Sequence, residues 1–256
     1  MKENNSSINN FRYVIRGATR ALTGSTVFRS ERIIEPGTNG LSDFEEKISE
    51  GYGGVIIMKH FSLKDPPQAI RDIVFSTPTL IRKRVLAPNA QHQIYPGVKM
   101  MGRIMGVKIA PIVTENTVKK ALKRGKPTPT LNEGSVEFVR EAVDYLRQGQ
   151  LVVIAPEGER RDNLEPYTKP TIGLLVAGAQ RDGVNEIMFL TVDLRVAGSD
   201  YSRRGFNLLS RYEVRVGRAL SLDQMMELAG GSLRKIDSAV LEEMRQTAAI
   251  PKPNRG

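Results

Sequence analysis

The sequence predicts an α/β fold with a mostly parallel or mixed central sheet flanked by helices. Two continuous apolar runs, Val55–Met58 and Leu151–Ala155, have the length and composition of strands that are buried on both faces. Before the second run, apolar residues recur at helical spacing at Val139, Ala142, Val143 and Leu146, with Gly149 at the expected helix end. Strands that alternate with helices are typical of a sheet whose strands run mainly in one direction.

Further segments extend this alternation. A helix is predicted from Asp65 through Phe75, because aspartate followed by proline is a common helix start. Residues 78–135 break into short apolar pieces between prolines, where we expect a strand over Val107–Val113 and a basic loop over Lys119–Thr130. The C-terminal part predicts a helix, two strands and two closing helices: Thr171–Arg181, Ile187–Val196, Tyr212–Val216, Ser221–Leu228 and Leu233–Ala248.

The 256 residues suit one large domain, and we expect an N-terminal basic segment over residues 1–39 before an α/β domain over 40–256. Within the first segment, Ile8–Arg29 combines apolar residues near helical spacing with arginines on the other side. Such a helix either docks on the domain with a solvated face or lies on an anionic membrane. Gly17 and Gly24 favour the first interpretation, since glycine weakens an independent helix.

The composition excludes several kinds of site. The chain has no cysteine, so disulfides, thiolate metal sites and cysteine nucleophiles are excluded, and its two histidines are too few for a three-histidine zinc site. Its net charge of +10 favours anionic partners such as lipid headgroups, phosphorylated metabolites, an acidic carrier protein or nucleic acid. No apolar run reaches the roughly 18–20 residues of a membrane span, and the N-terminus lacks a secretory pattern, so we expect a cytoplasmic protein, soluble or peripherally membrane-bound.

The first motif with chemistry is a histidine that follows the first predicted strand. His60 is separated by four residues from Asp65, which a strand-to-helix turn could fold back onto it. A histidine can take a proton near neutral pH, and a carboxylate in hydrogen-bond reach orients it and stabilises its charged form. The alternative is an aspartate that only caps the helix beside an incidental histidine.

The second motif follows the other buried run and reads Pro156-Glu157-Gly158-Glu159-Arg160-Arg161. Glycine lets the backbone approach a ligand closely, and arginine offers a planar fork that suits phosphate. The alternative is a solvated turn with surface charges. Both motifs stand just past the carboxyl ends of predicted strands, which is where open α/β sheets bind ligands.

Taken together, the two motifs resemble those of the glycerol-phosphate and lysophosphatidic acid acyltransferase family. The family's first motif is a strand, a histidine, four residues and an aspartate, often followed by proline, seen here as Val55–Pro67. Its phosphate-binding motif is proline-glutamate-glycine-threonine-arginine, seen here as Pro156–Arg160 with Glu159 at the threonine position. The resemblance covers residues 40–247 loosely and is specific only at these two motifs.

The resemblance implies an O-acyltransferase of phospholipid metabolism. It implies His60 as general base and Asp65 as its partner, with acyl-CoA or acyl carrier protein as donor and no metal or cofactor. It implies that a glycerol-phosphate or lysophospholipid acceptor is held through Glu157, Gly158 and Arg160. Lys108 is a further candidate for the phosphate, because it falls in the stretch where the family carries a phosphate-binding arginine.

Three departures keep other interpretations open. Lys59 replaces the usual asparagine before the histidine, no arginine occurs in the Gly106–Val113 stretch, and residues 78–135 lengthen the separation between the motifs. Lys59 and Glu159 keep one alternative open, an acyltransferase-like protein that binds lipid without activity. A basic nucleic-acid-binding protein is less favoured, since aromatic residues make up 6% with no tryptophan and are not interleaved with arginines. We therefore expect no nucleic-acid partner.

Overall fold

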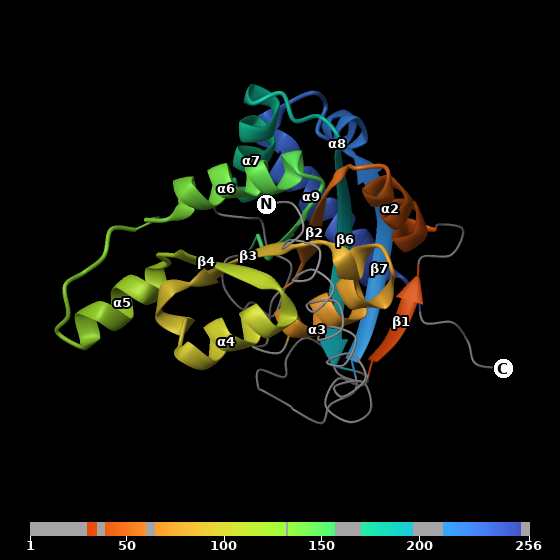
Figure 1. Ribbon diagram of the computed structural model, residues 1–256. Coiled ribbons are helices and arrows are strands. Elements are labelled where there is room, and N and C mark those ends of the chain that lie inside the picture. The colour runs from red at the N-terminus through yellow and green to blue at the C-terminus, as the bar shows by residue number, and fades with distance from the viewer. Residues whose placement is uncertain are drawn as a thin grey trace, which may run out of the picture.

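The computed structural model describes residues 30–34, 39–59, 65–131, 133–156, 170–196 and 212–251. These residues form one seven-stranded sheet in the order β1-β7-β6-β2-β5-β3-β4 (Figure 1). The strands are β1 (Ser30–Ile34), β2 (Gly53–Met58), β3 (Val85–Ala90), β4 (Val107–Ile112), β5 (Leu151–Ile154), β6 (Ile187–Val196) and β7 (Tyr212–Ser221). Every neighbouring pair is parallel except β6 with β7, so the predicted fold class is confirmed.

Helices cover both faces of this sheet. The α-helices are α2 (Gly40–Ser49), α3 (Asp65–Asp72), α4 (Pro96–Met105), α5 (Glu115–Lys123), α6 (Ser135–Arg147), α7 (Thr171–Arg181), α8 (Leu222–Leu228) and α9 (Ile236–Ala249). Short 3-10 helices are η1 (Val74–Ser76), η2 (Leu80–Arg82), η3 (Gln91–Gln93) and η4 (Leu233–Lys235). One apolar cluster joins the sheet to α2, α3 and the end of α4, and a second joins it to α6, α7, α8 and α9.

The centre of the sheet is buried on both faces because its strands are continuous apolar runs. Every residue of β2 and of β5 is buried, as the unbroken Val, Ile and Leu sequence predicted. Close packing also requires glycine here: a Cβ added to Gly53 would lie 2.6 Å from the Leu146 Cα of α6. Gly149, just after α6, adopts the left-handed φ of +62° expected at a helix end.

Most elements outside residues 78–135 agree with the sequence prediction. Helix α7 and strand β6 have the predicted bounds, and β5 ends one residue earlier than predicted. Strand β7 continues to Ser221, beyond the predicted Val216, because its antiparallel pairing with β6 extends along both strands. Helix α3 begins at Asp65 but ends at Asp72, and η1 then covers the rest of the predicted helix.

Two regions differ from the prediction. Ser30–Ile34, which we placed in the N-terminal segment, forms edge strand β1 beside β7, while Ile8–Arg29 lies outside the described residues. The loop predicted over Lys119–Thr130 is wrong in its first part, because α5 runs from Glu115 to Lys123. This helix is fixed at its start by Thr114, whose hydroxyl accepts a hydrogen bond from the Thr117 backbone N–H at 3.3 Å.

Candidate functional site

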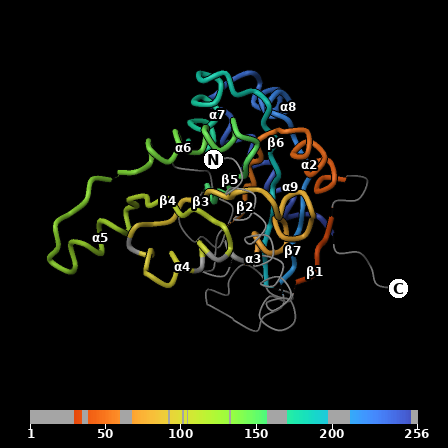
Figure 2. Tube along the Cα trace, in the orientation of Figure 1, coloured from red at the N-terminus to blue at the C-terminus, as the bar shows by residue number. Residues whose placement is uncertain are grey.

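The two predicted motifs follow strands that are direct neighbours. Strands β2 and β5 are parallel, and Ile57 pairs with Ile154 in their register (Figure 2). The chain therefore leaves β2 at Lys59 and leaves β5 at Pro156 on the same side of the sheet, where the carboxyl ends of these strands lie. Neighbouring strands lie about 4.8 Å apart. The chain continues from these two points into His60 and Glu157, respectively.

The predicted site residues themselves fall largely outside the described part of the chain. His60 lies between the described residues 59 and 65, and Glu157, Gly158 and Arg160 lie between 156 and 170. Asp65 is described by its backbone as the first residue of α3, which starts five positions after His60. The positions where the two motifs begin are thus fixed side by side, whereas the contacts among their side chains stay a prediction.

Lys59, which immediately precedes His60, is fully buried. Its backbone N–H donates to the Val192 carbonyl of β6 at 3.4 Å, so the ladder of the sheet continues up to the residue before the histidine. A fully buried ammonium group is costly to desolvate and does not face bulk water. Lys59 therefore belongs to the interior of the protein at the carboxyl end of β2.

Lys108 is not brought together with the two strand ends. It lies near the start of the edge strand β4, where it pairs with Leu86, and Leu86 in turn pairs with Val152 of β5. Lys108 is therefore level with Val152, which lies two residues before the end of β5. The Lys108 ammonium group forms an ion pair with Glu141 of α6 at 2.5 Å, so its charge is already partnered. Its position does not favour the predicted role in phosphate binding.

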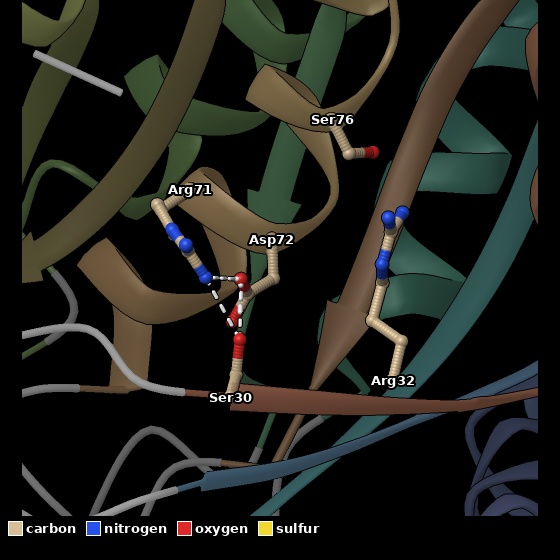
Figure 3. Close-up of a pocket in the computed structure, with 5 residues that line it drawn as sticks. All are labelled: Ser30, Arg32, Arg71, Asp72 and Ser76. Carbon is tan, nitrogen blue, oxygen red and sulfur yellow. Dashed lines mark hydrogen bonds and ion pairs between the residues drawn. The ribbon is translucent and has the colours of Figure 1, made fainter. Parts of the chain in front are cut away.

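A polar cavity opens on the same side of the sheet as the carboxyl ends of β2 and β5. It has a volume of about 180 Å³ and lies between β1, α3 and η1, lined by Ser30, Arg32, Arg71, Asp72 and Ser76 (Figure 3). Its place at the edge follows from the register: Ser30 pairs with Tyr212, and Tyr212 pairs with Val196, the last residue of β6. Strand β6 is the other parallel neighbour of β2, so the cavity and the start of the histidine motif share this edge.

One side of the cavity is a hydrogen-bonded cluster around Asp72. The nearly fully buried carboxylate accepts hydrogen bonds from the Ser30 hydroxyl at 2.8 Å, from the Gln68 amide and from Arg71. Arg71 also donates to the Ser30 hydroxyl at 2.8 Å, so β1 and α3 are tied together through polar groups. Figure 3 shows this cluster with Arg32 on the opposite side of the cavity.

The Arg32 side chain makes no hydrogen bond or ion pair with another side chain in the described ranges. Since Asp72 offsets the charge of Arg71, Arg32 supplies the net positive charge of the cavity, which suits an anionic group. The sequence prediction missed this cavity. The spacing of Gln68 and Asp72, one turn apart on α3, could have suggested their hydrogen bond, but only the fold brings Ser30 and Arg32 beside them.

Other arginines at this edge are already engaged. The Asp193 carboxylate of β6 contacts Arg195 at 2.6 Å and Arg215 at 3.8 Å. Both arginines donate to the Ala248 carbonyl at the end of α9, at 2.7 Å and 2.9 Å respectively. Cations at a helix C-terminus offset its partial negative charge. These side chains fasten α9 to β6 and β7, and we do not assign them to ligand binding.

The helix that follows the second motif is held by a buried carboxylate. The two oxygens of Asp237 in α9 accept the backbone N–H groups of Ile172 at 3.0 Å and of Gly173 at 2.9 Å. Burial raises the pKa of the Asp237 carboxyl above its usual value, and these hydrogen bonds oppose that shift. Asp237 therefore caps the first turn of α7 from another helix.

Among the described residues, none of the helices has the length and apolar character that crossing a bilayer requires. Within the same ranges, no three His, Cys, Asp or Glu side chains gather as a metal site would need. Comparison with models of protein families and with curated protein sequences finds no match for this chain.

Proposed function

We propose that this protein is an O-acyltransferase that moves a fatty acyl chain from a thioester to a hydroxyl of a glycerol-phosphate or lysophospholipid acceptor. The observation that supports the proposal best is the pairing of β2 with β5. This pairing starts the segment with His60 and the segment with Arg160 from neighbouring points on one edge of the sheet. Two segments that carry a base and a phosphate ligand and that start so close together suit a small substrate with both a hydroxyl and a phosphate.

In the proposed reaction His60 accepts the proton of the acceptor hydroxyl while its oxygen attacks the thioester carbonyl carbon. The carbon–oxygen bond forms, and the carbon–sulfur bond of the resulting tetrahedral intermediate then breaks. The leaving thiolate takes the proton from His60, which restores the neutral histidine and releases the thiol. Asp65 orients the imidazole and stabilises it while it is charged.

Glu157, Gly158 and Arg160 are proposed to hold the acceptor, with Arg160 on the phosphate. The donor is acyl-CoA or acyl carrier protein, and both are anionic, which suits a chain of net charge +10. The reaction as written uses no metal or cofactor. The proposal includes a cytoplasmic location with peripheral contact to the inner face of the membrane, where such acceptors reside, and no nucleic-acid partner.

The test uses the two histidines as a matched pair. Purified wild type, His60→Ala and His92→Ala are incubated with radiolabelled acyl-CoA or acyl carrier protein and a panel of lysophospholipids and glycerol 3-phosphate. We expect wild type and His92→Ala to form ester at equal rates and His60→Ala to lose on the order of 10²–10⁴ in rate, the usual contribution of a general base. Equal rates for all three proteins would refute the role of His60.

A second candidate is a lipid-binding protein of this fold without transferase activity, because Lys59 stands where the resembled motif has asparagine. Lys59→Asn tests this possibility, since asparagine is the residue expected at that position from the resemblance. If wild type binds lysophospholipid without forming ester, and Lys59→Asn forms ester, the protein is a binding protein whose activity Lys59 suppresses.

A further inference from the structure

The positive charge of the chain is concentrated in one region, which we call the basic lobe, residues 95–136. It holds eight lysines and arginines and two glutamates, a net charge of +6 out of the +10 of the whole chain. The lobe contains α4, β4, α5 and the turn into α6. In Figure 1, α5 and the chain that follows it project from the body of the molecule.

The same region exposes apolar side chains. Of the nine large hydrophobic residues that are exposed in the described ranges, five belong to the basic lobe. They are Tyr95 (58% exposed), Met100 (60%), Leu122 (61%), Leu131 (42%) and Val136 (78%). Single exposed hydrophobics are ordinary, and of these five Leu122 is the one that lies among the exposed lysines of α5.

Helix α5 gains little stability from the rest of the protein. It has nine residues, fewer than the roughly 12–15 that an isolated helix needs in water, and Thr117 is its one buried residue. Leu122 shares the exposed part of this helix with Lys119, Lys120 and Lys123. An amphipathic helix of this composition, largely unsupported by its own domain, is suited to lie on another surface.

The attachment of α5 places it beside the candidate site. Strand β4 runs parallel to β3, and β3 runs parallel to β5, so the carboxyl ends of all three strands lie at one edge. Thr114 begins α5 two residues after the end of β4. The lobe therefore projects from the edge at which the chain leaves β5 towards Glu157.

We propose that the basic lobe docks on an anionic lipid bilayer, with the lysines of α5 at the headgroups and Leu122 in the acyl boundary. Charge complementarity supports this occupant, because the exposed Lys119, Lys120 and Lys123 of α5 carry the charge opposite to that of an anionic leaflet. A nucleic acid is a poorer fit, since residues 95–136 contain a single aromatic residue, Tyr95, on which a base could stack, and it lies at the start of α4, away from the lysines of α5 in sequence. This inference rests on the peripheral membrane contact of the proposed function and assigns it to a surface, and vesicle binding tests it separately from ester formation.

The experiment is co-sedimentation of the full chain with vesicles of phosphatidylcholine alone or of phosphatidylcholine with 30% phosphatidylglycerol. We expect binding only to the anionic vesicles and a loss of binding as salt is raised. Each basic side chain near such a surface is worth roughly fivefold in partitioning, so Lys119→Gln/Lys120→Gln should lower it about 25-fold. Leu122→Ser should lower it about tenfold through the lost apolar contact.

A matched control lies in η4, where Leu233, Arg234 and Lys235 are also exposed. Arg234→Gln/Lys235→Gln and Leu233→Ser should change binding less than twofold, and unchanged thermal unfolding shows that all variants fold. Equal loss from both sets of variants would overturn the proposal, as would equal binding to the two kinds of vesicle. If binding to single-stranded RNA falls with the lysine pair while Leu122→Ser leaves vesicle binding intact, the lobe is a nucleic-acid surface.

Discussion

The central strands and the basic lobe differ in how much of their sequence is buried. All residues of β2 and β5 are buried between helices on both faces, whereas edge strand β4 has only two buried residues, Val107 and Ala110, among exposed and half-buried ones. The centre is held by apolar packing, and the lobe leaves five large hydrophobic side chains in solvent. The comparison indicates that the centre supports the site, while the lobe keeps its surface available for a partner.

A truncation in the centre gives the largest expected effect on stability. Phe189 of β6 is buried in the second apolar cluster, and Phe189→Ala should lower the free energy of unfolding by about 3–5 kcal/mol. Tyr95→Ala, at the exposed start of α4, should change it by less than about 0.5 kcal/mol. Urea denaturation of both variants measures the difference. Similar losses would mean that Tyr95 is buried in solution and that the lobe belongs to the core.

A methyl group added in each region should act in opposite directions. In Gly53→Ala the new Cβ meets the backbone of Leu146, so the free energy of unfolding should fall by about 1–3 kcal/mol. Gly97 lies in α4 with no atom within 4 Å of an added Cβ, and alanine favours a helix over glycine. Gly97→Ala should therefore be neutral or stabilise the protein by up to about 1 kcal/mol. Destabilisation by both variants would show that Gly97, at the start of α4, is packed against another element.

Removing each of the two helix caps should destabilise a different part of the protein. Asp237→Ala leaves the N–H groups of Ile172 and Gly173 buried without their acceptor, and should cost about 1–3 kcal/mol in global unfolding. Thr114→Ala removes the cap of α5, which should cost about 1 kcal/mol but only within the lobe. Hydrogen exchange read by mass spectrometry separates them: faster exchange confined to residues 115–123 is expected for Thr114→Ala. Exchange that spreads into β5 would mean that the lobe and the centre unfold together.

The smallest expected effect is a pH dependence that comes from Asp237. Because burial raises the pKa of this carboxyl in the folded protein, the folded state binds the proton more tightly than the unfolded state. Stability should therefore fall as the pH rises from the ordinary aspartate pKa of 3.8 through the raised pKa, and then level off. Asp237→Asn should lack this contribution, so the difference between wild type and variant in urea denaturation should shrink over the same window. A difference that grows with rising pH would mean that the hydrogen bonds from Ile172 and Gly173 outweigh burial.

The sequence was informative where burial is strong and local patterns are unbroken. The apolar runs of β2, β5 and β6 and the periodic spacing in α6 and α7 predicted elements close to those observed. Residues 78–135 were harder because the strands β3 and β4 contain prolines and partly exposed residues, so neither pattern is continuous. Strand β1 could not be predicted from its own five residues, since it exists through pairing with β7 at the far end of the chain.

For the candidate site, the sequence predicted both motifs but not how their strands lie relative to each other. Adjacency of β2 and β5 is a property of sheet order, which local patterns do not contain. The cavity beside Arg32 likewise depends on β1 and α3 meeting across about 40 residues of sequence, as the hydrogen bond from Ser30 to Asp72 shows. Lys108 is a case in which the sequence prediction is not favoured by the structure. Its sequence position suited phosphate binding, but its ammonium group is paired with Glu141.

The pairing of β2 with β5 also has a consequence for how the protein folds. Ile57 and Ile154 are neighbours in the sheet although they are 97 positions apart in the chain. Pairings of such long range are slow to form, because a large loop must close before they contribute any stability. During synthesis the segment with His60 emerges well before the strand that precedes Glu157 exists. The segments with His60 and Glu157 can therefore come together only after most strands of the sheet have been synthesised.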